Sequence, residues 1–450
     1  AELEKECFNA GGGYKSDCSK ITYRMAHIPA LVEEDYMTAA VNFRSAINFE
    51  LSEYADYRGA VHKITKDWKD IDYELKKDDR FGSQLRKKDL FKDKIPGITA
   101  GLTDDEKARV IYRYIQNWFK WNNVYGLYSE NGLKKALDTR SGNVGDINIS
   151  LIAAMNAAGL KADAVLVSTR ENGIVNKLYP VVSDFNYVVA KVNIGDKHYL
   201  LDATDPLLPF GLLPLRCIND QGRVFSMDKP SYWMDLSASE KGSKLHTLQL
   251  TLTEGGKIRG NLITIYKGYE AYNKRRTVKK FNSVEEYIEN LDENMPKIRF
   301  LKAEIKNLDE VDLPVSETFE LEIDAFDSLE KEKFTFNPYF MDRTEVNPFK
   351  LRDRVYPVDL GSASETKVIL TLNFPDKFEV IGKPETVGLA LPQNGGRFIT
   401  DFNISGNTIN FSQLTDLKKS VYMQNEYPYL KELFNKMVQV HQTDIIFRKK

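Results

Sequence analysis

The side chains of this 450-residue chain that could do chemistry are few, because it contains only three cysteines and five histidines. Cys217 has the apolar neighbours Leu215 and Ile218, which favours a packed thiol over a reactive one. His198 and Asp202 alternate onto the same face of a predicted strand, so an imidazole and a carboxylate could approach each other there. The other histidines have no partner at a motif spacing, and they are His27, His62, His246 and His441.

Cys7 and Cys18 bracket a glycine-rich turn near the start of the chain. In an exported protein they could close a small disulfide loop worth about 2–3 kcal/mol, and two free thiols are the alternative. Spacing alone does not decide between the two. No histidine lies close to this cysteine pair, so the sequence predicts no zinc site.

The composition excludes several classes of function. Hydrophobic residues make up 42% and charged residues 28% of the chain, as in ordinary globular proteins. The net charge of -2 gives no overall attraction to nucleic acid or to an anionic membrane. No apolar run approaches the roughly 20 residues of a membrane-spanning helix. We therefore expect no nucleic-acid partner, no transmembrane segment and no cofactor.

The elements that must position the candidate residues are clearest in residues 141–205. A loop with two glycines leads into a helical pattern, which Gly159 ends as a C-cap residue would. The apolar face of that helix is formed by Ile147, Leu151, Met155 and Ala158. The pattern then predicts a buried strand and a hairpin of two strands, at residues 164–167, 184–194 and 198–202.

Loop, helix, strand and hairpin in this order resemble the transglutaminase-like core, a relative of the papain-type cysteine hydrolases. In that family a G-x-C-x-D loop brings the catalytic Cys to the helix start, and the His and the Asp follow on the next two strands. The segment from Gly142 to Asp146 (GNVGD) places Val144 at the Cys position. The segments FNYV and LDAT place Tyr187 at the His position and Asp202 at the Asp position.

Two of the three catalytic groups are therefore missing, which the resemblance implies is fatal to the family's chemistry. Valine has no nucleophilic atom, and tyrosine, with a pKa of about 10, is a poor base at neutral pH. Such a loss typically costs on the order of a million-fold in rate. Asp202 becomes a buried carboxylate that needs other partners. Ser150 would lie ~9 Å further along the helix on another face, and Ser141 has no motif histidine to activate it.

The resemblance extends beyond the core and predicts three domains in an α+β protein. Residues 1–56 are similar to the closing part of a β-sandwich that precedes the core in exported proteins of Gram-negative bacteria, with strands expected at 21–25 and 39–49. Residues 57–240 would form the core with its leading helices, and residues 241–450 an antiparallel β-sandwich region with two helices. The resemblance implies a periplasmic or cell-surface protein from which an N-terminal portion is missing.

These observations predict a non-catalytic transglutaminase-like protein of the cell envelope. A retained groove would bind a peptide-like or glycan-linked partner or help to scaffold an envelope assembly. The candidate groove residues are Gly142, Asn143, Asp146, Asn186 and Trp121. Two alternatives stay open: a cysteine-type peptidase or amidase with another nucleophile, and a structural spacer whose groove is filled at Val144.

Overall fold

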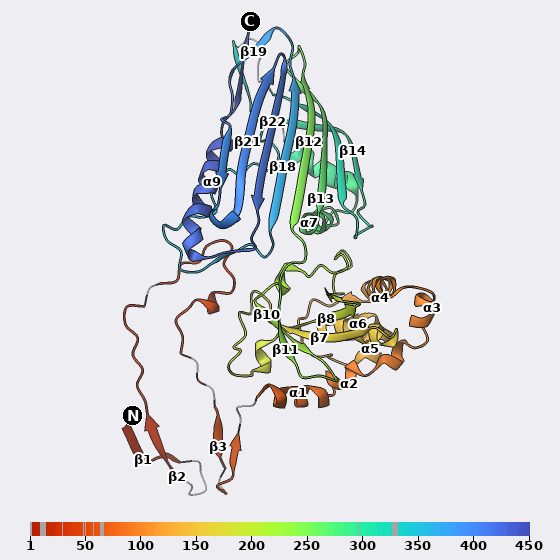
Figure 1. Cartoon of the computed structure of the whole chain (residues 1–450), viewed down its shortest axis with the longest axis vertical. Helices are drawn as coiled ribbons and strands as arrows, with labels where there is room; N and C mark the ends of the chain where they lie inside the picture. Colours follow the sequence, from red (N-terminus) through yellow and green to blue (C-terminus); the bar gives the residue numbers. More distant parts are fainter. Residues whose placement is uncertain are drawn as a thin grey trace.

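The computed structural model describes residues 2–9, 15–28, 30–47, 49, 51–56, 58–63, 67–295, 297–325 and 332–450, with side chains except those of 2–9, 15–17 and 63. The molecule is elongated, with a large sheet at one end, a mixed helix and sheet region in the middle, and an N-terminal arm along one side (Figure 1). The chain is thus α+β, as the sequence predicts.

The described residues of the N-terminal arm form no sandwich among themselves. The arm consists of two separate hairpins joined by extended chain with one short 3-10 turn: β1 (Glu2–Asn9), β2 (Lys15–Lys20), η1 (Ala40–Asn42), β3 (Glu53–Ala55) and β4 (Val61–Lys63). The strands expected at 21–25 and 39–49 are wrong for the residues described there. Alternating residues form a strand only where a neighbouring strand supplies a ladder of hydrogen bonds. Here none pairs with them, and the side chains of Ile21 and Phe49 stay 56% and 74% exposed.

A buried ion pair attaches the arm to the C-terminal region. The Glu34 carboxylate accepts from Arg354 Nη1 at 2.9 Å and from the Leu351 N–H at 2.7 Å, and the Tyr427 hydroxyl donates to it at 3.1 Å. The Arg354 and Glu34 side chains are only 0% and 5% exposed. The carboxylate bound by Arg354 therefore comes from this chain itself.

The core region is built on a five-stranded antiparallel sheet in the order β11-β10-β7-β8-β9. Helix α6 packs against β7 and β8 and is almost entirely buried. The helices of this region are α1 (Trp68–Lys77), α2 (Gly82–Leu85), η2 (Lys88–Phe91), α3 (Ile95–Thr99), α4 (Asp104–Trp118), α5 (Leu133–Thr139), α6 (Val144–Ala157), η3 (Val182–Asp184) and η4 (Leu215–Cys217). The strands are β5 (Lys120–Trp121), β6 (Ser141–Gly142), β7 (Lys161–Val167), β8 (Tyr187–Ile194), β9 (Lys197–Leu201), β10 (Gln221–Phe225) and β11 (Tyr232–Asp235).

The start of α6 is fixed by its own sequence. The Asn143 side chain accepts from the Asp146 N–H at 2.8 Å, and the Asp146 carboxylate accepts from the Asn143 N–H at 3.1 Å, which is a capping box. A Cβ at position 145 would lie 2.3 Å from the Tyr128 carbonyl oxygen, so Gly145 lets the preceding segment pack closely against the helix. Gly159, with φ of +81°, ends the helix where the sequence places a C-cap.

The C-terminal region has an eight-stranded sheet in the order β14-β15-β13-β12-β18-β22-β21-β20. The expected antiparallel arrangement needs one correction, because β12 and β18 run parallel. The long connection between them, which carries α7, α8 and the five strands β13 to β17, makes that parallel pairing possible. A smaller sheet, β16-β24-β19, and helix α9 contribute to the same hydrophobic core.

The strands of the C-terminal region are β12 (Gly242–Leu252), β13 (Ile258–Lys267), β14 (Ile298–Lys306), β15 (Val315–Ile323), β16 (Lys333–Phe336), β17 (Val358–Asp359), β18 (Ser364–Asn373), β19 (Phe378–Gly382), β20 (Val387–Ala390), β21 (Gly396–Ser405), β22 (Thr408–Leu417), β23 (Val421–Tyr422) and β24 (Ile445–Lys449). Its helices are α7 (Tyr269–Val278), α8 (Val284–Asn294), η5 (Pro392–Asn394), η6 (Gln424–Glu426) and α9 (Tyr427–His441).

Candidate functional site

The three positions singled out by the sequence lie at the ends of adjacent elements. Val144 is the first residue of α6, Tyr187 is the first residue of β8, and Asp202 directly follows β9, which pairs with β8. All three side chains are completely buried. Tyr187 and Asp202 are in direct contact, because the Tyr187 hydroxyl donates to Asp202 Oδ2 at 2.7 Å.

Asp202 is fully supplied with hydrogen-bond donors. Its Oδ1 accepts from Asn148 Nδ2 at 3.0 Å and from the Thr204 N–H at 3.1 Å. Its Oδ2 accepts from Tyr187 and from Arg216 Nη2, the latter at 3.1 Å. A buried carboxylate is stable only when it is paired and hydrogen-bonded in this way. The partners that Asp202 needs are therefore all within the chain.

Arg216 covers Tyr187 and Asp202 on the side that faces the solvent. Its Nη2 also donates to the Tyr187 hydroxyl at 2.8 Å, and its guanidinium lies over the rings of Trp121 and Tyr187 at 5.1 and 5.3 Å. The Arg216 side chain is 22% exposed, whereas Asp202 beneath it is not exposed at all. Burial opposes the charged guanidinium, but the Asp202 carboxylate outweighs it and raises the pKa of Arg216. The Arg216 guanidinium therefore stays charged at every ordinary pH.

The groups in this centre are unsuited to general-base or nucleophilic chemistry. Burial, with the nearby Asp202 carboxylate adding to it, raises the pKa of the Tyr187 hydroxyl well above its usual value. The same two causes raise the pKa of the Cys217 thiol, which is completely buried. A thiol acts as a nucleophile in its thiolate form, so Cys217 is held in the unreactive form.

The expected groove residues mainly make hydrogen bonds and packing contacts that stabilise the fold. Gly142, Asn143 and Asp146 are buried at the start of α6, where Asp146 also accepts from the Ser129 hydroxyl at 2.5 Å. The Asn186 side chain pairs with Thr169, accepting from its N–H and donating to its hydroxyl, both at 2.9 Å. Trp121 is half-buried and donates to the Val124 carbonyl at 3.2 Å.

Two of the residues considered as replacement nucleophiles or bases, Ser150 and His198, make no described hydrogen bond to this centre. Cys217, in contrast, lies near Asp202. Ser150 is buried and donates to the Asp146 carbonyl within α6. His198 is exposed on β9, which agrees with a surface histidine. Cys18 is disulfide-bonded and Cys217 is a free thiol. The side chain of Cys7 lies outside those described, so its pairing with Cys18 stays a prediction.

Three partners of Asp202 were missed from the sequence, and two of them carried a local signal. Asn148 lies one helical turn after Val144, on the same face of α6, and Thr204 lies two residues after Asp202. Arg216 had no such signal, because a loop of irregular chain separates it from β9.

A second polar cluster in the C-terminal region was also missed, because its members are far apart in sequence. His246, which appeared to have no partner, lies with Nε2 2.8 Å from Asp342 Oδ2 and Nδ1 2.9 Å from the Thr264 hydroxyl. Lys244 Nζ lies 2.7 Å from the same Asp342 oxygen. Although burial opposes ionisation, the hydrogen bond from His246 and the charge of Lys244 hold the pKa of Asp342 well below its usual range. His246 and Thr264 are at most 1% exposed, so this cluster offers no open nucleophile.

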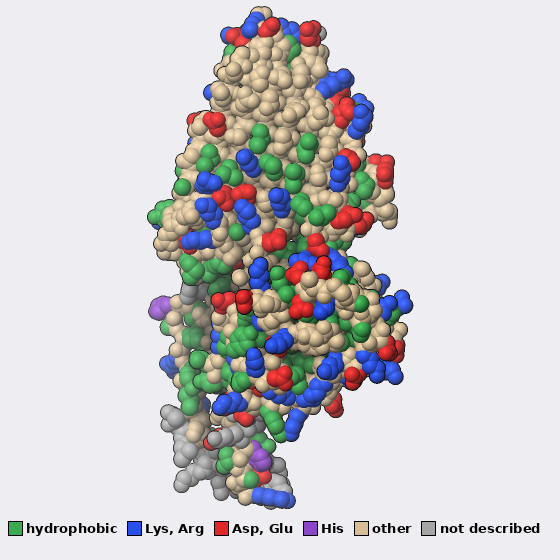
Figure 2. All heavy atoms as spheres, turned by 45° about the vertical axis from the view of Figure 1, so that its right-hand side comes forward, with side chains coloured by type: hydrophobic (Ala, Val, Ile, Leu, Met, Phe, Trp, Pro, Cys, Tyr) green, Lys and Arg blue, Asp and Glu red, His purple; other side chains and the backbone are tan. Residues whose placement is uncertain are grey.

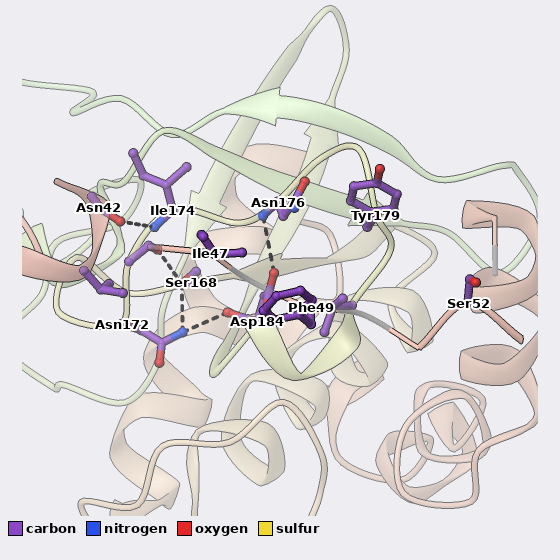
Figure 3. A pocket seen from close by; sticks show the side chains of 13 residues that line it. Asn42, Ile47, Phe49, Ser52, Ser168, Asn172, Ile174, Asn176, Tyr179 and Asp184 are labelled. Carbon is purple, nitrogen blue, oxygen red and sulfur yellow. Dashed lines mark hydrogen bonds between the residues drawn. The ribbon is translucent and has the colours of Figure 1, made fainter. Parts of the chain in front are cut away.

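A pocket of about 1050 Å³ lies between the arm and the core loop that follows β7 (Figure 3). The arm contributes Asn42, whose side chain accepts from the Ile174 N–H at 2.8 Å, and the core contributes Asp184, which accepts from the Asn176 N–H at 3.3 Å. Apolar side chains also line it and remain exposed by 42% to 74%: Val41, Ile47, Phe49, Ile174 and Tyr179.

Other classes of site receive no support from the described part of the chain. Within it, no group of three or more His, Cys, Asp or Glu side chains is arranged to hold a metal ion. None of the helices found there is long and apolar enough to cross a membrane.

Comparison with known proteins gives the fold class but no activity. Residues 332–447 match a family described as a domain of unknown function with a solved structure, DUF3858. No curated protein matches the chain. A solved structure of a "putative protease" from Parabacteroides distasonis is similar with a TM-score of 0.50 and 13% sequence identity. The match covers 90% of this chain and 63% of that one. The chain therefore shares the α+β fold of that structure and spans less than two thirds of its length.

Proposed function

We propose that this chain is a non-catalytic transglutaminase-like protein of the cell envelope, which binds a peptide-like or glycan-linked partner. The observation that carries the proposal is the closed centre of Tyr187, Asp202 and Arg216 beside Val144. In the hydrolases of this superfamily the aspartate orients a histidine that activates a thiol. Here the aspartate is occupied by a phenol and a guanidinium, and the thiol position holds a valine.

The partner would bind outside this centre, in the pocket between arm and core. The centre itself is filled, since Val144, Tyr187 and Asp202 are completely buried. The pocket combines exposed apolar side chains with amide and carboxylate groups, a mixture that suits a peptide or a sugar-bearing segment. Ile174 and Tyr179, exposed by 52% and 51%, would supply the apolar contacts.

Affinity capture from an envelope extract tests this proposal, with the intact chain as bait. We expect a partner that is retained by the wild type and lost when Tyr179→Ser and Ile174→Ser are combined. Tyr429→Ser is the matched control, because Tyr429 is 55% exposed on α9 and lies outside the pocket. A partner retained equally by all variants would contradict binding in this pocket. The absence of any retained partner would contradict the binding function.

A cysteine-type peptidase or amidase is the second candidate, favoured by the likeness of the fold to a structure described as that of a "putative protease". Among the described residues, its nucleophile would have to be Cys217, the free thiol. Incubation with a mixture of peptides and amides, followed by mass spectrometry, separates the two candidates. Hydrolysis that disappears in Cys217→Ser or after alkylation would replace the binding proposal with the enzymatic one.

A further inference from the structure

A cavity of about 460 Å³ lies where the core region meets the C-terminal region, and the proposed function does not use it. Arg109, Tyr199 and Phe210 form its core wall, and the start of α7 together with residues 311–314 forms the opposite wall. Figure 2 shows acidic and basic side chains gathered along the junction of these two regions. The cavity is thus polar at its rim and partly aromatic on one wall.

Arg275 of α7, a buried cation, lies in the wall of this cavity. Its side chain is completely buried, and its Nε and Nη2 donate to carbonyl oxygens of Asn307, Glu310 and Leu313. Its Nη1 is also buried but has no hydrogen-bond partner. A buried donor without an acceptor is costly, and a cationic one especially so, which indicates that an acceptor belongs there.

The Asp312 carboxylate lines the same cavity but does not serve as that acceptor. Its Oδ1 accepts from the Phe210 N–H at 3.0 Å, and its Oδ2 lies 3.2 Å from Arg113 Nη2. Burial lowers the pKa of Arg275; the charge of Asp312 opposes this effect, and that of Arg113 adds to it. A further negative group beside Nη1 would stabilise the guanidinium.

The beginning of α7 adds a second source of positive potential. Its N-cap is Gly268, with φ of +55° and no side chain to accept from the first-turn N–H groups. A Cβ at this position would lie 2.2 Å from the Lys241 carbonyl oxygen, so no residue with a capping side chain fits. Uncapped N–H groups and the helix dipole favour an anion at this end. Lys267, exposed at the rim, adds a full positive charge.

We propose that this cavity binds a small carboxylate carried by an apolar group, either a free organic acid or the C-terminus of a peptide. The carboxylate would accept from Arg275 Nη1, and the apolar part would lie against Tyr199 and Phe210. A single negative charge fits better than a phosphate, because Asp312 and Glu240 also line the cavity and would repel a dianion.

Isothermal titration calorimetry of the full chain tests the proposal with matched probes. The probes are 3-phenylpropionate, its neutral amide, an acetylated Ala-Phe peptide with a free or an amidated C-terminus, and inorganic phosphate. We expect the two carboxylates to bind and the two amides not to bind. The ratio of affinities between the free acid and the peptide then identifies the source of the carboxylate. Equal binding of the amides, tighter binding of phosphate, or no binding of either carboxylate would overturn the proposal.

Two variants locate the binding. Lys267→Glu reverses a charge at the rim without touching buried contacts, and we expect it to weaken carboxylate binding about tenfold. Lys367→Glu makes the same charge change on β18, away from the cavity, and should leave the affinity unchanged. Arg275→Gln should abolish binding in protein that circular dichroism shows to be folded. If that variant does not fold, equal affinities of Lys267→Glu and Lys367→Glu would still contradict the proposed location.

Discussion

Two aspartates of this molecule, the buried Asp202 in the core region and the partly exposed Asp342 in the C-terminal region, are stabilised in different ways. Asp202 has no exposed surface and accepts from an amide, a backbone N–H, a phenol and a guanidinium. Asp342 is 38% exposed in its side chain, and its partners are Lys244 and His246. It also lies on the walls of two cavities, of about 340 and 240 Å³.

This difference indicates the role of Asp202, which stands at the position that resembles a catalytic aspartate. The Asp202 centre contains no histidine and no space, so its charge is used to hold β8, β9 and α6 together. The Asp342 cluster keeps charged partners beside two cavities, so a ligand could reach it, and the buried His441 lines one of the same cavities. The comparison predicts that substitutions at the first centre act on stability, whereas the second region shows dependence on pH.

Arg216→Met should give the largest effect. Among the described hydrogen-bond donors to Asp202, only Arg216 is a cation, so the substitution leaves a buried carboxylate without a positive partner. We therefore expect a loss of about 3–5 kcal/mol in the free energy of unfolding. Urea denaturation measures it. Arg352→Met is the control, since the Arg352 side chain is 97% exposed and should cost almost nothing. Combining Arg216→Met with Asp202→Asn should recover part of the loss. A loss below about 1 kcal/mol would mean that Asp202 does not depend on this ion pair.

The second region should lose stability as the pH falls from 7 to 5. His441, which lines the 340 Å³ cavity with Asp342, is buried, and its Nδ1 accepts from the Thr344 N–H at 2.9 Å. Burial, with the charge of Arg343 adding to it, lowers the pKa of His441 to about 4. Below pH 6.5 the unfolded chain therefore binds a proton that the folded chain does not, and the free energy of unfolding decreases by about 2 kcal/mol at pH 5.

Urea denaturation at pH 7, 6 and 5 measures this effect. In His441→Gln the slope over this range should be much smaller, whatever its absolute stability. An unchanged slope in the variant would assign the pH dependence to other groups.

Tyr187→Phe should have an intermediate effect at the first centre. It removes the hydroxyl that donates to Asp202 and accepts from Arg216, but it leaves the ring and the ion pair in place. We expect a loss of about 1–2 kcal/mol, compared with nearly none for Tyr429→Phe at a surface position. A loss as large as that of Arg216→Met would show that the ion pair itself requires the phenol.

The sequence predicts those parts of the fold that depend on neighbouring residues in the chain. The helix that ends at Gly159 and the strand expected at residues 164–167 follow from local periodicity and from capping and turn residues, and both occur in the structure. Helix α7 was missed, because its residues Tyr269–Val278 mix buried aromatic and charged side chains without a clear apolar face. The strands predicted at residues 21–25 and 39–49 of the arm were wrong, because alternation alone cannot reveal that no described strand pairs with these residues.

The candidate site shows the same limit. The sequence indicates that Asp202 needs donors, but it cannot supply Arg216, which reaches the carboxylate from beyond a loop. His246 and Asp342 lie 96 residues apart and meet only because the tertiary fold brings the segment between β16 and β17 to β12. Such contacts depend on the tertiary fold, and the periodicity of apolar residues in the sequence does not predict them.

The smallest change in stability is expected for Val144→Cys, and it tests whether the first centre can support thiol chemistry like that of the hydrolases it resembles. Valine and cysteine have similar volumes, so the cost should stay below about 1 kcal/mol. The new thiol would be buried at the start of α6, where the helix dipole lowers its pKa and desolvation raises it. We expect the second effect to dominate while Tyr187 and Arg216 fill the centre. The single variant should then react with iodoacetamide more slowly than a surface cysteine.

Adding Tyr187→His replaces the phenol with an imidazole that Asp202 can orient. If the backbone retains the geometry of the hydrolases, the imidazolium form would stabilise the thiolate, and the thiol pKa would fall below about 8.5. Alkylation rates measured across pH 6–10 on Val144→Cys, with and without Tyr187→His, separate the two cases, and Cys217→Ser in both backgrounds removes the native thiol. A thiol pKa that the histidine does not lower would mean that the centre is related to the hydrolases by fold alone. A lowered value would mean that only two side chains separate the closed centre from a reactive one.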